Sequence, residues 1–127
     1  MADNRDYFIQ QMENGSIQIS DDVAASVAAS AVLEVDGVYG LSGNIGTDIA
    51  EMLGRKTLAK GIRLSAEDDN SISVECNIVA SFGASVLQLA ESVQKSVKTS
   101  VESVTGLSVR QVNVNINAIA MPREQKK

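Results

Sequence analysis

The sequence predicts a two-layer α+β sandwich in which two main helices cover one face of a four-stranded sheet. Four segments alternate apolar and polar residues, as strands do, at 16–20, 62–66, 72–80 and 112–120. Two longer segments, 23–35 and 86–104, repeat apolar residues every three or four positions, as amphipathic helices do. A chain of 127 residues suits one domain with a single core.

The predicted elements follow the order β-α-(short helix)-β-β-α-β, with the short helix expected at 45–53. Two right-handed crossovers would deliver this order as a ferredoxin-like sandwich. We expect a flexible N-terminal arm at 1–14, a single α+β domain at 15–121 and a short basic tail at 122–127.

The first main helix is expected to begin after Ser20, whose hydroxyl can cap it. Two acids, Asp21 and Asp22, then lie at the positive end of the helix dipole. Gly37 is placed to end the helix. The apolar stripe comprises Val23, Val27, Ala31 and Val35, widened by Ala24 and Ala28.

The second main helix has clear signals at both ends. Ser85 and Gln88 have the spacing of a capping box, and Gly106 is placed to end the helix. Its expected apolar stripe comprises Val86, Ala90, Val93, Val97, Val101 and Val104. Before it, the run 68–70 (Asp-Asp-Asn) predicts the turn of a hairpin between strands 62–66 and 72–80.

The closing strand directs its apolar residues to one face and its asparagines to the other. With both helices on the apolar face, the asparagine face is open to water or to a partner. Val79, Ile119 and Met121 share the parity of the asparagines, and this apolar patch indicates that part of that face is covered.

The composition argues against most enzyme classes. The chain has no histidine and one cysteine, so an imidazole base, a Cys–His pair, a Cys/His zinc site and an internal disulfide are all excluded. Cys76 has the parity of a core residue. The spacing of the glycines at 40, 43 and 46 matches no nucleotide-binding fingerprint, and the acidic run 67–69 is explained by a solvated turn. We therefore assign no catalytic residue, no cofactor site and no metal ligand.

The charge and the aromatic content disfavour nucleic acid as a partner. The formal net charge is −5, aromatic residues make up 3% of the chain, and the expected strands carry no ring on which a base could stack. The chain starts without a secretory signal, and its longest apolar stretch, 23–33, is about half of the roughly 20 residues that span a membrane. We expect a cytoplasmic protein without direct membrane insertion.

Two pieces of sequence are specific in their order and spacing. Val104-Thr105-Gly106-Leu107 leads into Val112-Asn113-Val114, and Leu53-Gly54-Arg55-Lys56 leads into Lys60-Gly61. With these pieces, residues 15–120 resemble the alkaline shock protein family, the cell-envelope stress-response proteins of Gram-positive bacteria.

The resemblance implies a non-enzymatic cytoplasmic protein that is linked to envelope stress and alkaline tolerance and tends to self-associate. It also implies that a small integral-membrane partner holds some members at the membrane, and it brings no established catalytic residues. Members often carry longer charged tails than the 123–127 tail of this chain, which weakens the case for the same anchor.

We expect partner binding at two surfaces. They are the basic loop of Arg55, Lys56 and Lys60, and the strand face of Asn113, Asn115 and Asn117. The alternative function is a nucleic-acid-binding or regulatory module on the same sandwich, whose affinity would fall steeply with salt. A small hydrolase or transferase would need a nucleophile–base pair that the sequence does not supply.

Overall fold

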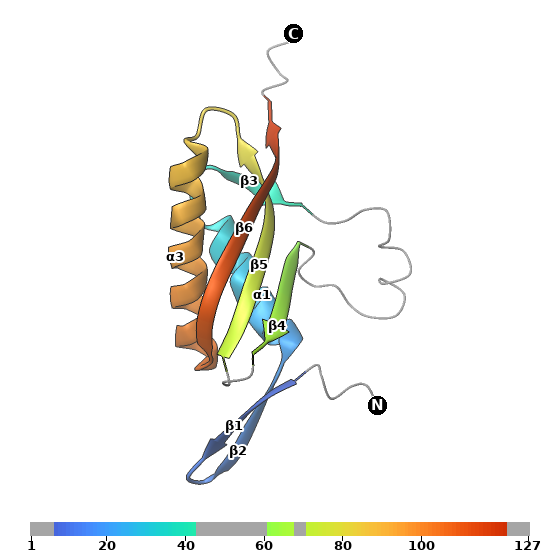
Figure 1. Ribbon diagram of the computed structural model, residues 1–127, viewed down its shortest axis with the longest axis vertical. Coiled ribbons are helices and arrows are strands. Elements are labelled where there is room, and N and C mark those ends of the chain that lie inside the picture. The colour runs from blue at the N-terminus through green and yellow to red at the C-terminus, as the bar shows by residue number, and fades with distance from the viewer. Residues whose placement is uncertain (1–6, 43–60, 68–70, 122–127) are drawn as a thin grey trace, which may run out of the picture.

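The computed structural model describes residues 7–42, 61–67 and 71–121. Figure 1 shows the elements in their spatial arrangement. In chain order they are β1 (Tyr7–Met12), β2 (Gly15–Ser20), α1 (Asp21–Leu33), β3 (Val38–Leu41), β4 (Ile62–Ala66), β5 (Ser71–Ser81), α3 (Val86–Thr105) and β6 (Ser108–Ala120).

The main sheet has four strands with β5 at its centre. β6 runs parallel to β5 along one side. On the other side, β4 pairs antiparallel with residues 72–76 of β5, and β3 pairs antiparallel with residues 78–80. The two short strands therefore share one edge of β5, end to end. They meet at Asn77, whose carbonyl accepts from the Ser42 amide at 2.7 Å and whose amide donates to the Gly61 carbonyl at 2.8 Å.

Both helices pack on the same face of this sheet, so the fold class predicted from the sequence is confirmed (Figure 1). The core lies between the two layers. α1 contributes Ala28, Ala31 and Val32, β5 contributes its alternate residues from Ile72 to Ala80, and α3 contributes Leu89, Val93, Val97 and Val101. The predicted hairpin is also confirmed, because β4 and β5 pair with Leu64 opposite Val74.

The connectivity differs from the split pattern of a ferredoxin-like sandwich. β5 and β6 are direct parallel neighbours joined by α3, with no strand between them. The strand predicted at 16–20 exists, but it pairs with β1 in a separate two-stranded sheet. The unpredicted strand β3 supplies the fourth member of the main sheet. The short helix expected at 45–53 lies outside the described residues.

The N-terminal region also differs from the expected arm. Residues 7–12 form a strand because β2 offers them a complete antiparallel partner, with Phe8 opposite Ile19 and Gln10 opposite Ile17. Phe8 packs against the core, and the Gln10 side-chain amide donates to the Thr105 carbonyl at 2.9 Å. The hairpin is therefore fastened to the domain.

Helix α1 begins as predicted but ends early and turns a different face inward. Ser20 accepts the Asp22 amide as the N-cap, whereas the helix ends at Leu33, four residues before Gly37. Its buried residues are Ala24, Ala28, Ala29, Ala31 and Val32, while Val23 is exposed and Val27 and Val35 are only partly buried. Alanines face inward because α1 packs against α3 as well as the sheet, and small side chains permit that close contact.

Helix α3 has the predicted ends. The Ser85 hydroxyl accepts the Gln88 amide, and Gly106 has a left-handed backbone with φ of 78°. Val93, Val97 and Val101 are buried as predicted, and Leu89 and Thr105 complete the stripe. Val86 and Val104, expected in it, are exposed because the buried positions recur every four residues from Leu89 to Thr105 and neither valine falls on that line.

Candidate interaction surface

The outer face of the main sheet is the one that the helices do not cover. β5 directs Glu75 and Asn77 to this face, and β6 places Asn113 opposite Glu75 and Asn115 opposite Asn77. β4 adds Arg63 opposite Glu75 from the other side. Residues distant in the sequence are therefore brought side by side on one polar surface, which we call the asparagine face and define by Arg63, Glu75, Asn77, Asn113 and Asn115.

A hydrogen-bond network fixes the centre of the asparagine face. The Asn115 side-chain amide donates to the Glu75 carboxylate at 2.9 Å and to the Asn77 side-chain carbonyl at 3.0 Å. The Asn77 amide donates in turn to the Gly61 carbonyl at 3.1 Å. A side-chain amide has two N–H donors, so both donors of Asn115 are used within the face. The oxygens of Glu75 and Asn115 keep capacity to accept, and Arg63 and Asn113 add donors to the same surface.

Gly61 permits the close approach on which this network depends. Its φ is +92°, and a Cβ at this position would lie 3.0 Å from the Asn77 carbonyl oxygen. A larger residue would be strained and would push against the backbone of β5.

Asn117 lies at an irregularity of β6. The register between β5 and β6 shifts between Ile78 and Val79, so Asn117 is an extra residue in β6. Its side-chain amide donates to the Ser42 hydroxyl at 3.2 Å, across β5.

The same shift removes the apolar patch expected on this face. After the extra residue, Ala118 lies opposite Val79 and Ile119 lies opposite Ala80, which is fully buried on the helix side. Ile119 therefore has the parity of the core side, and the grouping of Val79, Ile119 and Met121 predicted from strict alternation is wrong.

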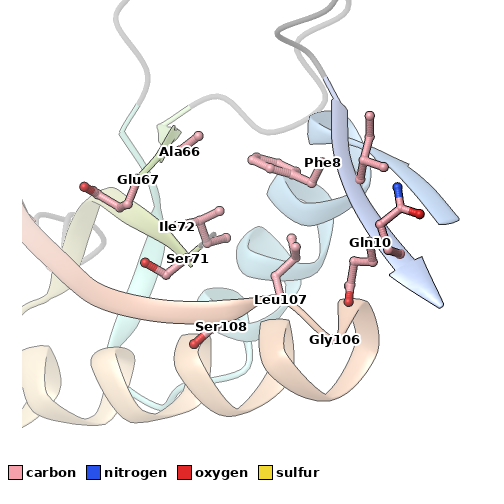
Figure 2. A pocket seen from close by; sticks show the side chains of 11 residues that line it. Phe8, Gln10, Ala66, Glu67, Ser71, Ile72, Gly106, Leu107 and Ser108 are labelled. Carbon is pink, nitrogen blue, oxygen red and sulfur yellow. The ribbon is translucent and has the colours of Figure 1, made fainter. Parts of the chain in front are cut away.

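A pocket of about 570 Å³ lies between the hairpin and the main sheet (Figure 2). Phe8, Ile72 and Leu107 supply apolar lining, and Gln10 and Glu67 supply polar lining. The Gln10 amide donates to the Thr105 carbonyl, and Glu67 accepts from the Ser73 hydroxyl. Gln11, Ser71 and Ser108 add further polar lining. The Gln10 and Glu67 side chains thus help to hold the hairpin and β5 in place.

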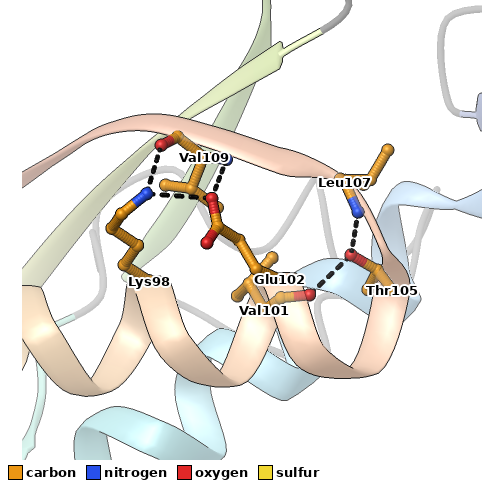
Figure 3. Close-up of polar contacts among 6 residues, drawn as sticks. All are labelled: Lys98, Val101, Glu102, Thr105, Leu107 and Val109. Carbon is orange, nitrogen blue, oxygen red and sulfur yellow. Dashed lines mark hydrogen bonds and ion pairs between the residues drawn. The ribbon is translucent and has the colours of Figure 1, made fainter.

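Polar side chains of α3 bond to the backbone of β6 (Figure 3). The Glu102 carboxylate accepts the Val109 amide at 2.8 Å, and Lys98 donates to the Val109 carbonyl at 3.1 Å and to Glu102 at 2.9 Å. The hydrogen bond from Val109, followed by that from Lys98, lowers the pKa of Glu102. The Gln94 amide donates to the Val112 carbonyl at 3.0 Å.

The comparison with models of protein families shows which family the chain belongs to. The model of the alkaline shock protein family, described by a cell envelope-related function, matches residues 9–121. The chain belongs to the alkaline shock protein family. This confirms the resemblance that the sequence pieces indicated.

Relatives of this alkaline shock protein family member occur in Bacillus and Streptococcus. The uncharacterized protein YqhY of Bacillus subtilis is 32% identical over 105 residues, which cover 83% of this chain and 77% of YqhY. The uncharacterized protein Spy1614 of Streptococcus pyogenes is 32% identical over 114 residues, covering 88% and 93% of the two chains. Among solved structures, MamM-CTD 215-293 matches with a TM-score of 0.48 and 15% identity, covering 77% of this chain and 98% of that chain.

The structure brings together some of the predicted site residues of this family member. Asn113 and Asn115 share the asparagine face with Glu75 and Asn77, and Asn117 follows at the bulge. Their role in binding stays a prediction. The basic loop, with Arg55, Lys56 and Lys60, lies outside the described residues.

The lone cysteine of the chain, Cys76, is buried in the core. Burial raises the pKa of the Cys76 thiol to about 12, and the negative charge of Glu75 adds to the effect. Within residues 7–42, 61–67 and 71–121, no three His, Cys, Asp or Glu side chains group in a way that could hold a metal ion. None of the helices described in this family member is long and apolar enough to cross a membrane.

Proposed function

We propose that this chain is a non-enzymatic scaffold of the cell envelope that works by binding other proteins. In this proposal it is a cytoplasmic protein of the envelope and alkaline stress response. A protein partner, such as a small integral-membrane protein, brings it to the membrane surface, and copies of the chain associate with one another. The cell envelope-related function of the alkaline shock protein family supports the setting.

The asparagine face supports the proposed protein binding best, because it holds ordered acceptors at Glu75 and Asn115. The Asn115 side chain donates one N–H to Glu75 and the other to Asn77. These bonds hold the side-chain oxygens of Glu75, Asn77 and Asn115 in place before a partner binds. Preformed acceptors favour a partner that supplies N–H donors, such as arginine, lysine or backbone amides. We propose that the membrane partner presents such donors to Glu75 and its neighbours.

The proposed absence of catalysis rests on the side chains themselves. The sequence has no histidine, and the thiol of Cys76 is buried and protonated at neutral pH. Turnover of a small molecule by the purified chain, after stringent removal of contaminants, would contradict this part of the proposal.

Two charge-matched variants test the asparagine face. Glu75→Gln removes one negative charge from the face, and Glu91→Gln removes one from the exposed surface of α3. Tagged proteins are recovered from membranes, and the proteins that co-purify are identified and quantified. We expect Glu75→Gln to reduce recovery of the membrane partner at least about tenfold, the effect of losing about 1.4 kcal/mol of binding. Glu91→Gln should bind like the parent, and equal recovery with both variants would exclude the asparagine face.

A further inference from the structure

The outer edge of β6 is unevenly protected. Within the described residues β6 pairs with one strand only, β5, so its other edge has no strand beside it. Along the first part of that edge, Lys98 and Glu102 bond to the backbone of Val109 (Figure 3). Farther along, the Gln94 amide donates to the carbonyl of Val112. Side chains of α3 thus satisfy the backbone groups that a second strand would otherwise use.

The second part of the edge lacks this protection. Peptide groups of alternate residues in a strand point to the same edge, so those of Val114 and Ile116 point the same way as the Val112 carbonyl. No hydrogen bond from α3 reaches Val114 or Ile116 among the contacts of the described residues. Residues 111–121 also contain no charged residue and no proline, the two residue types that usually block edge pairing.

The sequence of this edge is complementary to itself. Between the two register shifts of β6, residues 112–116 read Val-Asn-Val-Asn-Ile, which is almost palindromic about Val114. In an antiparallel pair centred on Val114, each Val112 faces an Ile116 and each Asn113 faces an Asn115. Apolar side chains then meet on the helix side, and on the outer side the Asn113 amide can donate to the Asn115 side-chain oxygen of the other copy.

We propose that two copies of this chain pair antiparallel through residues 112–116 of β6, with Val114 on the two-fold axis. The residues whose peptide groups point outward, namely Val112, Val114 and Ile116, then lie opposite one another, which is the arrangement that forms ladder hydrogen bonds. The Val112 carbonyl keeps a second lone pair beside Gln94. This inference rests on the self-association in the proposed function and is independent of the membrane partner.

Charge favours this stretch of the surface for contact between identical copies. Each copy carries a net charge of −5, so two copies repel one another. A strand without charged residues places none of that charge in the contact. The dimer should therefore strengthen as salt screens the remaining repulsion, whereas contacts between opposite charges would weaken.

Selective cross-linking tests the register. In the proposed pair, Asn113 of one copy lies about 4.5 Å in Cα distance from Asn115 of the other, within the range of a disulfide. Two Asn113 residues would lie roughly 8 Å apart, beyond that range. We expect a mixture of Asn113→Cys and Asn115→Cys chains to give several-fold more cross-linked dimer under mild oxidation than either variant alone. Cys76 is fully buried and does not compete.

A second variant tests the edge without cross-linking. Val114→Pro removes an N–H that points away from β5, so the β5–β6 ladder keeps its bonds while the dimer loses two at its centre. By sedimentation over a range of concentrations, the parent should dimerise and the folded variant should stay monomeric.

The outcomes distinguish pairing through the β6 edge from self-association by any other surface. A parent chain that stays monomeric at every concentration overturns both the edge pairing and the proposed self-association. A parent chain that oligomerises without the selective cross-link, or whose folded Val114→Pro variant still dimerises, overturns the edge pairing alone. Neither result bears on the membrane partner, which the Glu75→Gln experiment tests.

Discussion

Glu102 links helix α3 to strand β6 through one carboxylate. Because the Val109 amide and Lys98 stabilise its charged form, its pKa lies below the usual value. A lowered pKa in the folded state contributes stability above the unfolded-state pKa, and this contribution is lost as pH falls through the folded-state pKa. We expect Glu102→Gln to reduce the free energy of unfolding by about 1 kcal/mol at neutral pH.

The pH dependence distinguishes this role from a general loss of helix stability. In denaturant titrations, the free energies of unfolding of the parent and of Glu102→Gln should become equal as the pH is lowered. Glu91→Gln, on the exposed surface of the same helix, should stay within about 0.5 kcal/mol of the parent. If the loss of unfolding free energy in Glu102→Gln were the same from acid to neutral pH, the stabilising role of the ionised Glu102 carboxylate would be contradicted.

Cys76 allows the packing of the core to be followed with a thiol reagent. Its side chain is fully buried and its pKa is about 12, so at neutral pH the reactive thiolate is scarce and inaccessible. We expect labelling of the native protein to be slower than labelling in denaturant by orders of magnitude and to report opening of the fold. Rapid labelling of the native protein would show that β5 is not buried as described.

Single residues were predicted well where simple alternation holds. The parity of Cys76 along β5 placed it in the core, and Asn113 and Asn115 lie on the outer face as expected. Alternation failed at Ile119 because one extra residue at Asn117 inverts every later position. The bonds from Asn115 to Glu75 depend on the parallel register of two strands 40 residues apart, and the sequence does not encode that register locally.

At the scale of elements, α3 depends on its buried valines and not on its intrinsic helix propensity. Valine is a mediocre helix former, and Val97 is fully buried whereas Val104 is 64% exposed. We expect Val97→Ala to lower the free energy of unfolding by about 2 kcal/mol, because it removes buried methyl groups and leaves a cavity. Val104→Ala should change it by less than about 0.5 kcal/mol, or raise it slightly. Chemical denaturation measures both, and equal losses would contradict the packing of α3.

The hairpin of β1 and β2 depends on the rest of the domain. An isolated two-stranded sheet is at best marginally stable in water. Phe8, which packs on the core, and the bond from Gln10 to Thr105 hold it in place. We expect Phe8→Ala to accelerate hydrogen exchange of β1 and β2 while exchange of β5 stays slow. Unchanged protection of the hairpin would show that Phe8 does not hold it.

Elements with local signals were predicted, and elements that tertiary pairing creates were not. Ser85 and Gly106 mark the ends of α3 in the sequence, and both act as expected. β3 has four residues including Gly40, so it offers no alternation to detect, and only its pairing with β5 makes it a strand. β1 reads Tyr-Phe-Ile-Gln-Gln-Met, which shows no alternation, so only its pairing with β2 makes it a strand.

For the whole molecule, the class of fold was predictable but the order of strands was not. Two amphipathic helices and several half-polar strands leave few ways to bury their apolar faces, so a two-layer α+β sandwich follows. The strand order depends on which strand lies beside β5. β6 lies directly beside β5, and β2 pairs with β1 in the separate hairpin. Both β2 and β6 alternate apolar and polar residues, so their sequences alone do not show which of them pairs with β5.

The basic loop is the part of the proposed function that depends on the charge of the whole chain. Arg55, Lys56 and Lys60 form a local positive cluster in a chain whose net charge is −5, so they are suited to an acidic protein surface at the membrane. We expect the double variant Arg55→Glu/Lys56→Glu to lose recovery in the membrane fraction while circular dichroism shows an intact fold.

A matched double variant, Lys126→Glu/Lys127→Glu, makes the same change of charge in the tail and should keep the parent's recovery. Quantitative blotting of membrane and supernatant fractions at two salt concentrations measures both effects. Since salt screens the attraction between opposite charges, recovery of the parent should fall as salt rises, and it should do so less for the Arg55→Glu/Lys56→Glu chain. If both double variants lose recovery equally, net charge and not the loop governs membrane association.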